Sequence, residues 1–249
     1  MKGITDMKLE NYEVYLPSYS IGSTIYNKIG PVCESYGRTV LVIGGEKALA
    51  AAYEKIAAAV AETRLTIIGK ELFGTDCTYD NVERLRALPV YQQADMVFGV
   101  GGGKALDTVK CLCITDDKPV FTFPTIASNC SACTSVSIMY NPDGTFLKPN
   151  FFIRPAMHAF IDTEIIAKAP SCYMWADLGD TYAKYYESTI SSRDERLEPS
   201  AIVGTFLLSR GVSLRHELIN QRDAPRDKRN VPNLRDSLQK KHRLNRRCL

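Results

Sequence analysis

The sequence predicts an α/β fold, with a parallel β-sheet in its N-terminal part and helices alone in its C-terminal part. Residues 39–43 (TVLVI) and 94–100 (ADMVFGV) are short, mainly apolar runs of the kind found in strands buried on both faces. Each run ends at glycines and is followed by a helical pattern, over residues 46–62 and 104–113. Strands that alternate with helices in this way are typical of a parallel sheet, because each helix returns the chain to the start of the next strand.

The other elements of the N-terminal part follow in chain order. Residues 13–19 are the first segment with a structural pattern, and an amphipathic stretch then runs to Cys33. A short apolar run at residues 65–68 precedes a helical pattern over residues 81–88, and residues 120–123 form a further buried strand. The parallel sheet is therefore expected within roughly the first 125 residues.

A β-hairpin and a helical segment are predicted after the sheet. Residues 134–140 alternate apolar and polar side chains, and the turn sequence NPDG at residues 141–144 separates them from residues 145–152. From about residue 170 the pattern is helical, with no strand between the helices. We therefore divide the chain into an α/β domain over residues 1–169, the start of a helical domain over residues 170–208, and an atypical tail over residues 209–249.

The composition is that of an ordinary globular chain. Its 249 residues are 45% hydrophobic and 24% charged, which excludes collagen, coiled coil and disorder as descriptions of the whole chain. No run approaches the roughly 18 apolar residues that span a membrane, and the N-terminus lacks the apolar core of a signal peptide. We therefore expect a cytoplasmic protein with no membrane partner, whose eight cysteines are reduced thiols.

The tail over residues 209–249 differs from the rest of the chain. It holds 12 of the 31 Lys and Arg residues but 4 of the 28 Asp and Glu residues, and no aromatic residue follows Phe206. We interpret this shift as a truncated or frameshifted end, with the change of reading frame near Arg210. A basic tail that binds nucleic acid or acidic lipid is the alternative, but the tail has neither aromatic interleaving nor a binding motif.

A glycine-rich turn is the first candidate binding segment. Residues 101–104 (GGGK) lie where a buried strand turns into a helix, so backbone N–H groups and the positive end of the helix dipole point at any ligand there. The glycines let a phosphate approach the backbone closely. A tight turn without a ligand is the alternative. Asp107, one helical turn later, either reaches a ribose hydroxyl or is a solvated helix carboxylate.

A hydroxyl-rich segment is the second candidate. Residues 123–128 (FPTIAS) follow a buried strand, and Asn129, Ser131, Thr134 and Ser135 come close behind. Ligands of parallel sheets bind at the carboxyl ends of the strands, where small donors and acceptors suit the base and ribose of a nucleotide. A plain Ser/Thr-rich loop is the alternative.

Two further patterns bear on metal chemistry. The CxxC at residues 130–133 lies in a polar loop and the CxC at residues 111–113 on a helix, which argues against a zinc or redox site. Asp177 and Asp180 lie on one helix face beside aromatic residues, where they are either partners of a metal or surface acids.

Three segments together carry a family resemblance: residues 101–110 (GGGKALDTVK), 123–146 (FPTIASNCSACTSVSIMYNPDGTF) and 160–187 (FIDTEIIAKAPSCYMWADLGDTYAKYYE). In this order and spacing they resemble the iron-containing alcohol dehydrogenase superfamily, most closely its glycerol dehydrogenase branch. The resemblance covers about residues 8–208. It implies a nucleotide-binding α/β domain, an all-helical domain, and between them a cleft for NAD(P) and a divalent metal, zinc or iron.

The resemblance also implies roles for individual residues. Contact with the cofactor is implied for Gly102, Gly103, Lys104, Asp107, Thr125, Ser128, Thr134, Val136 and Tyr140. Asn129 and Cys130 stand in the substrate-binding segment, and Asp180 matches the first metal-binding carboxylate. In this family the metal holds the alcohol oxygen of the substrate and stabilises the alkoxide, which eases hydride transfer to the nicotinamide.

The sequence departs from the family pattern in three places. Residues 44–46 (GGE) replace an Asp that often contacts the adenosine ribose, so both NAD and NADP remain open. Cys130 replaces the substrate-binding Asp of glycerol dehydrogenases, which leaves the alcohol open. The family has two further metal ligands, both histidines on later helices, and neither His216 nor His242 stands in that context.

The sequence therefore predicts an oxidoreductase: a metal-dependent, NAD(P)-linked dehydrogenase of small alcohols or polyols, with weak or no activity in this short chain. The alternative is a non-catalytic, nucleotide-binding remnant of such an enzyme. We also expect apolar surface left exposed by missing helices to promote association into homo-oligomers.

Overall fold

The computed structural model describes residues 15–191 of the chain, and the side chains of residues 185, 188 and 191 are outside the description. Six parallel strands form one sheet in the order β1-β8-β5-β4-β2-β3. Their bounds in that order are Tyr19–Gly22, His158–Asp162, Val120–Pro124, Met96–Gly101, Thr39–Gly44 and Thr66–Leu72. The predicted α/β fold class with a parallel N-terminal sheet is thus confirmed.

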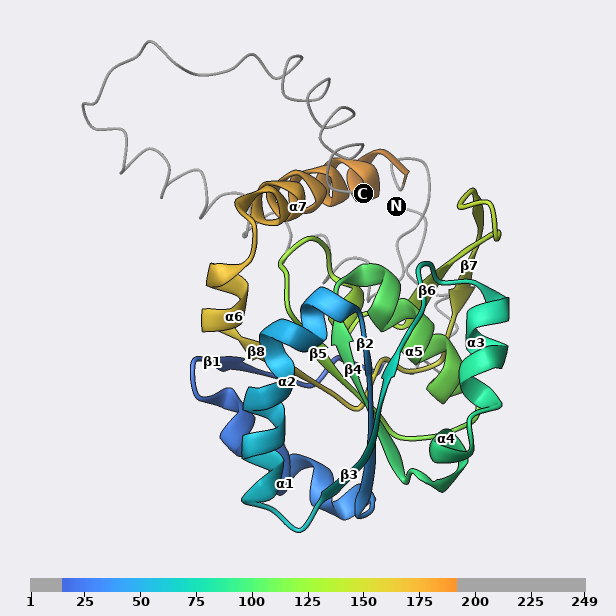
Figure 1. The fold of residues 1–249 in the computed structure, drawn as a ribbon. Helices are drawn as coiled ribbons and strands as arrows, with labels where there is room; N and C mark the ends of the chain where they lie inside the picture. The colour runs from blue at the N-terminus through green and yellow to red at the C-terminus, as the bar shows by residue number, and fades with distance from the viewer. Residues whose placement is uncertain (1–14, 192–249) are drawn as a thin grey trace, which may run out of the picture.

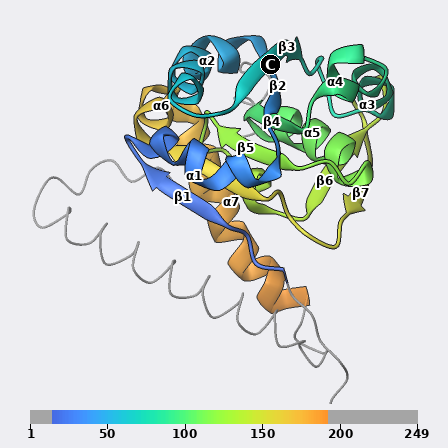
Figure 2. The same ribbon diagram turned by 90° about the horizontal axis from the view of Figure 1, so that it is seen from below.

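Helices cover both faces of this sheet (Figure 1). The helix bounds are Ile29–Cys33 for α1, Glu46–Ala61 for α2, Tyr79–Arg86 for α3, Pro89–Gln93 for α4, Gly103–Thr115 for α5, Thr163–Lys168 for α6 and Ser171–Ser191 for α7. Short 3-10 turns lie at Ile25–Lys28, Glu34–Tyr36 and Ser131–Cys133. Helices α1 and α2 pack on one face and α3, α4 and α5 on the other, as Figure 2 also shows.

Two apolar clusters fill the space between these layers. The first joins α1 and α2 to alternate side chains of the central strands, among them Val40, Val42 and Phe98. The second joins α3, α4 and α5 to the opposite side chains of the same strands, such as Leu41 and Val97. Because successive side chains of a strand point to opposite faces, strands covered on both faces must be apolar at every position. This explains why the sequence shows continuous apolar runs there.

The predicted hairpin is also present, as strands β6 (Val136–Tyr140) and β7 (Phe146–Phe151), which pair antiparallel outside the main sheet. Asn141 N–H donates to the Thr145 carbonyl, and Gly144 takes a positive φ of 81° in the turn. The hairpin lies next to α5, whose side chains it contacts. It therefore places residues 134–140 beside the helix that follows the triple glycine.

Three elements differ from the sequence expectation. Strand β1 begins at Tyr19, and the described residues before it, 15–18, form no regular element. Strand β8 and helix α6 were not predicted, because only three apolar residues (159–161) separate His158 from Asp162. The predicted helix over residues 81–88 begins at Tyr79 and ends at Arg86, because Thr78 caps its N-terminus and Pro89 starts a separate helix.

The remaining expectations are met in part. The seven cysteines within the described residues are all free thiols, and Cys248 lies outside them. No helix among residues 15–191 is both long and apolar enough to cross a membrane. The predicted tail over residues 209–249, with His216 and His242, lies outside the described residues, as does the part of the predicted helical segment beyond α7, residues 192–208.

Candidate functional site

The candidate site lies at the carboxyl ends of β2 and β4, where the strand order reverses. From β2 the chain moves outward to β3, and it then returns past β2 to β4 and β5. The loops that leave β2 and β4 therefore lead to helices on opposite faces of the sheet. In doubly wound sheets ligands bind at such a point. Helix α7 lies above this edge of the sheet in Figure 1.

Both loops at the switch point begin with glycines, and the packing requires them. A Cβ on Gly44 would lie 2.5 Å from the carbonyl oxygen of Val100. Gly101 has a φ of +153°, and a Cβ there would lie 2.8 Å from the Cβ of Ala105 and 4.0 Å from the nitrogen of Gly45. The two glycine turns therefore touch, and side chains on them would fill the space between the strand ends.

The N-terminus of α5 is open toward this space. Its N-cap residue, Gly102, is extended and has no side chain to cap the helix, so the first N–H groups have no side-chain cap. Gly102 accepts the first helical hydrogen bond, from Leu106 N–H at 3.0 Å. A helix of 13 residues that begins at an uncapped glycine turn offers both N–H donors and a positive dipole end to an anion.

The hydroxyl-rich segment after β5 lies against this same turn. Thr125 N–H donates to the Gly101 carbonyl at 3.1 Å. A Cβ on Gly103 would lie 2.6 Å from the side-chain nitrogen of Asn129, and one on Gly102 would lie 2.5 Å from Cδ1 of Ile126. The two segments that the sequence marked as candidate binding segments are thus in contact, although 20 or more residues separate them along the chain.

Lys104 lies in the first turn of α5, and its side chain contacts two groups. Its ammonium lies 2.6 Å from Oδ1 of Asp76, and it stands over the ring of Tyr140 at 5.6 Å from the centroid. Burial raises the pKa of the Tyr140 hydroxyl, and the Lys104 charge opposes that rise. Asp76 belongs to the loop after β3, and its sequence context gave no sign that it would meet Lys104.

The carboxylate of Asp107 is engaged inside the protein. It accepts hydrogen bonds from the Ser131 hydroxyl at 2.5 Å and from Ile138 N–H at 3.1 Å. It also forms an ion pair of 3.1 Å with the buried ammonium of Lys110. Asp107 is 7% exposed. The structure therefore places this predicted ribose contact beneath residues 131–138, where it supports them.

The other predicted cofactor residues surround the turn at different depths. Thr125 is buried, whereas Ser128, Thr134, Val136 and Tyr140 are partly exposed. The predicted substrate residues, Asn129 and Cys130, are exposed at the tip of the same loop. Their roles stay predictions, but the fold gathers all of them on one side of the α5 N-terminus.

Helix α7, which carries the predicted metal ligand Asp180, begins beside this loop, because Ser171 and Met174 line one hollow together with Ala127. Asp180 accepts a hydrogen bond from Lys184, four residues along the helix. Burial lowers the pKa of Lys184, but the hydrogen bond to Asp180 and the neighbouring acidic groups outweigh it and raise that pKa above its usual value. Lys184 and Asp180 therefore form an ion pair within α7.

The described residues do not by themselves form a metal site. Within residues 15–191 no group of three or more His, Cys, Asp or Glu side chains is placed to hold a metal ion, and the Asp180 carboxylate is bound to Lys184. A catalytic divalent metal normally has three protein ligands. Asp180 alone therefore does not fit such a group.

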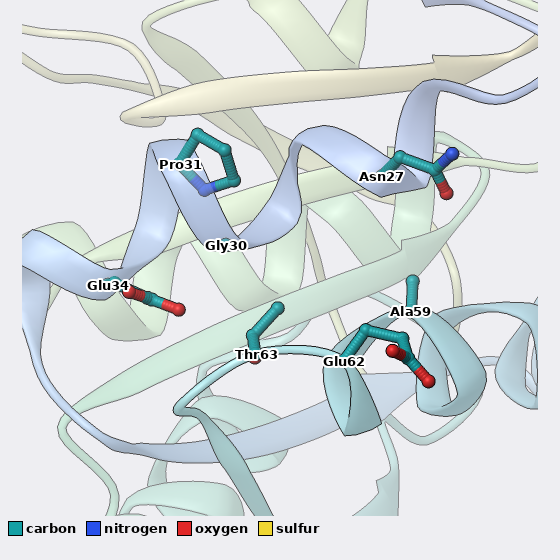
Figure 3. A pocket seen from close by; sticks show the side chains of 7 residues that line it. All are labelled: Asn27, Gly30, Pro31, Glu34, Ala59, Glu62 and Thr63. Atoms are coloured by element: carbon teal, nitrogen blue, oxygen red, sulfur yellow. The ribbon is translucent and has the colours of Figure 1, made fainter.

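Two hollows lie near the surface. One of about 310 Å³ is lined by Asn27, Gly30, Pro31, Glu34, Ala59, Glu62 and Thr63 (Figure 3). It lies between α1 and the end of α2, at the amino ends of the strands and away from the glycine turns. The other, of about 230 Å³, is lined by Ala127 and by residues of α6 and α7 up to Met174, and it adjoins the loop that carries Cys130.

A parallel sheet with two glycine turns and a helix N-terminus without a side-chain cap at its switch point defines an α/β protein of the doubly wound class. The model of the iron-containing alcohol dehydrogenase family matches residues 17–160, and the chain belongs to this family. The resemblance predicted from the three sequence motifs is therefore confirmed.

Curated relatives and solved structures agree with this assignment. A glycerol dehydrogenase of Thermotoga maritima is 40% identical over 121 residues, which cover 49% of this chain and 33% of that protein. A glycerol dehydrogenase of Escherichia coli is 32% identical over 179 residues, covering 70% of this chain and 47% of that protein. The crystal structure of glycerol dehydrogenase from Schizosaccharomyces pombe shares the fold, with a TM-score of 0.69 at 24% identity, over 80% of this chain and 52% of that one. The chain thus spans between a third and about half of the length of these proteins.

Proposed function

We propose that the chain binds NAD(P) across the glycine turn of α5 and residues 125–140, as part of a dehydrogenase of small alcohols or polyols. The observation that carries this proposal is the contact between the open N-terminus of α5 and the hydroxyl-rich segment after β5, at the switch point of the sheet. Relatives named glycerol dehydrogenases support the class of substrate.

The orientation of the dinucleotide follows from the surroundings of the turn. Its pyrophosphate fits the uncapped N-terminus of α5, with Lys104 at the mouth of the turn. Helix α7, which carries Asp180, begins beside the loop of Asn129 and Cys130, so the reactive end of the dinucleotide belongs on that side. The adenosine half then lies toward Gly45 and the end of β2. When bound, the nicotinamide accepts the hydride from the alcohol carbon.

The residues of this chain would bind and orient the reactants. Asn129 offers an amide to a substrate hydroxyl, and Cys130 offers a small uncharged group beside it. Both are exposed at the loop tip, where a small alcohol can reach them. A site of this kind fits an uncharged polyol.

Nucleotide binding without turnover is the second candidate, and one observation favours it. The Asp180 carboxylate is paired with Lys184, and the described residues supply no further ligands for a divalent metal. Binding of the dinucleotide needs only the residues of the α/β part. Oxidation of an alcohol with metal assistance would need ligands from outside the described residues.

Titration with NADH tests the cofactor site. We expect enhanced nicotinamide fluorescence with the wild-type chain, and about tenfold weaker binding with Lys104→Ala, because loss of a charge-assisted contact to phosphate costs about 1.5 kcal/mol. Lys148→Ala is the matched control, since that lysine stands over Tyr79 on the hairpin side and should leave the affinity unchanged. Equal affinities for all three proteins would contradict the proposed phosphate site.

Turnover separates the two candidate functions. A complete dehydrogenase should reduce NAD(P) when glycerol or a related diol is added, and EDTA should abolish this activity without abolishing the binding of NADH. Binding of NADH with no alcohol-dependent reduction would instead support the non-catalytic function.

A further inference from the structure

Lys110, on α5, is a cation completely enclosed by protein. Its side chain is 0% exposed. The ammonium pairs with Asp107 at 3.1 Å and donates to the Val136 carbonyl at 2.6 Å and to the Thr134 carbonyl at 3.1 Å. The Thr134 hydroxyl lies 3.3 Å away. A buried charge is costly unless every proton has an acceptor, and these four oxygens provide acceptors for all three protons of the ammonium.

The same face of α5 holds the rest of the neighbouring segment. Asp107 accepts from the Ser131 hydroxyl and from Ile138 N–H, and its own carbonyl accepts from the Ser137 hydroxyl at 2.8 Å. Residues 131–138 are thus attached to one helix by contacts to two charged side chains and to backbone carbonyls of the helix. The Asp107 carboxylate binds hydrogen-bond donors of this segment, and the Lys110 ammonium binds its acceptors.

In the proposed binding mode, the attached segment faces the reactive end of the dinucleotide. It carries Thr134 and Val136, and it leads into Tyr140. The N-terminus of the same helix is the proposed phosphate site, and Lys110 lies seven residues after Gly103, about 10 Å along the helix axis. A single rigid helix therefore sets the distance between the two halves of the site.

An apolar side chain in this place would fill the volume but would not orient the backbone. The carbonyls of Thr134 and Val136 both accept from the one nitrogen of Lys110, which fixes the peptide planes that follow Thr134 and Val136. Without the ammonium these carbonyls would lose their hydrogen-bond donor, and the segment would turn to find water. Burial lowers the pKa of Lys110, and the Asp107 charge opposes that effect.

We propose that Lys110 is a positioning residue for the nicotinamide half of the site: its buried ammonium, together with Asp107, holds residues 131–138 in the shape that NAD(P) requires. This inference rests on the proposed function. It predicts a selective defect, because ADP needs only the glycine turn and the β2 side, whereas NADH needs residues 134–140 as well.

The test compares Lys110→Met with the wild-type 249-residue chain in titrations with NADH and with ADP. We expect the dissociation constant for NADH to rise at least tenfold and that for ADP to change by less than twofold. Lys118→Met is the matched control. Its ammonium donates to the carbonyls of Tyr91 and Ala94, far from residues 131–138, so this variant should lose thermal stability but keep both affinities.

A second variant covers the case in which Lys110→Met does not fold. Ser131→Ala removes one hydroxyl that donates to Asp107. It should weaken the binding of NADH several-fold and leave the affinity for ADP unchanged.

Two results would overturn the inference: unchanged NADH affinity in the folded variants, or an equal loss of NADH and ADP affinity, which would show a structural role only. A wild-type chain that binds neither nucleotide would instead overturn the proposed function, and the inference with it.

Discussion

His158 joins the edge strand β1 to β8 through both of its ring nitrogens. Nδ1 lies 2.7 Å from the Ser18 hydroxyl and Nε2 lies 2.9 Å from the Ser20 hydroxyl. A neutral imidazole can accept at one nitrogen and donate from the other, and each serine can take the complementary role. The ring is 7% exposed, and burial lowers its pKa.

Stability should therefore fall as the pH is lowered past the ordinary histidine value of about 6.5. Between the lowered pKa of the folded state and that value, the unfolded chain binds more protons at this residue, so the free energy of unfolding rises with pH. The contribution is complete above the unfolded pKa. Urea unfolding from pH 8 to pH 5 should show this slope for the wild-type chain.

His158→Gln is the control for this prediction, because it keeps a donor and an acceptor near the two serines but cannot be protonated. The pH slope should be smaller in the variant. The carboxyl groups with lowered pKa, among them Asp95, titrate at lower pH and do not enter this window. An identical slope in both proteins would show that His158 is not the responsible group.

At the residue scale, the sequence predicted the groups that act through the backbone but not those that act through tertiary contacts. Gly103 and Thr125 could be predicted, because glycines after a buried strand and hydroxyls after the next one have a local physical meaning. Asp76 and Lys110 could not. Asp76 meets Lys104 from a loop 28 residues earlier in the chain, and Lys110 is buried because the hairpin packs on α5.

At the scale of elements, helix α6 depends on one buried carboxylate. Asp162 ends β8 and caps α6 by accepting from Glu164 N–H at 2.9 Å and Ile165 N–H at 3.3 Å. It is 0% exposed, and its other oxygen lies 2.5 Å from the ammonium of Lys55 on α2. This single side chain links the last strand, the helix that leads to α7, and the helix layer on one face of the sheet.

Asp162→Ala should lower the free energy of unfolding by about 2 kcal/mol, since it removes a cap worth about 1 kcal/mol and a partly buried ion pair. Asp162→Asn should lose less, because the amide oxygen can still cap the helix while the charge is gone. Urea unfolding of both variants gives the comparison. Equal losses in the two variants would show that the charge alone matters and that the cap does not.

The strands were predictable where their sequences are apolar over their whole length. Strands β2 and β4 lie at the centre of the sheet and are apolar at nearly every position, so their sequences are distinctive. Strand β8 is equally buried, but it is short. It begins at His158 and ends at Asp162, and the polar groups of both side chains bond to residues of other elements. Strand β3 lies at an edge of the sheet and has one exposed side. The apolar pattern of its sequence predicted only the first half of this strand.

At the scale of the whole molecule, the strand order creates the site. Because β2 has β3 on one side and β4 on the other, the glycine turns that leave β2 and β4 lie side by side at one edge of the sheet and lead to helices on opposite faces. Helices α2 and α5 both begin there, at glycines without side-chain caps, so two positive dipole ends meet at that edge. This convergence of segments distant in sequence is the basis of the proposed dinucleotide site.

Hydrogen–deuterium exchange of the full chain, with and without saturating NADH, tests this claim most directly. The account predicts that NADH slows amide exchange in two separate segments, residues 101–106 and residues 125–140, since both contact the dinucleotide. The backbone amides that surround the hollow at the opposite edge of the sheet, near Gly30 and Thr63, should exchange at an unchanged rate. Slowed exchange in only one of the two segments, or in neither while NADH is bound, would contradict the account.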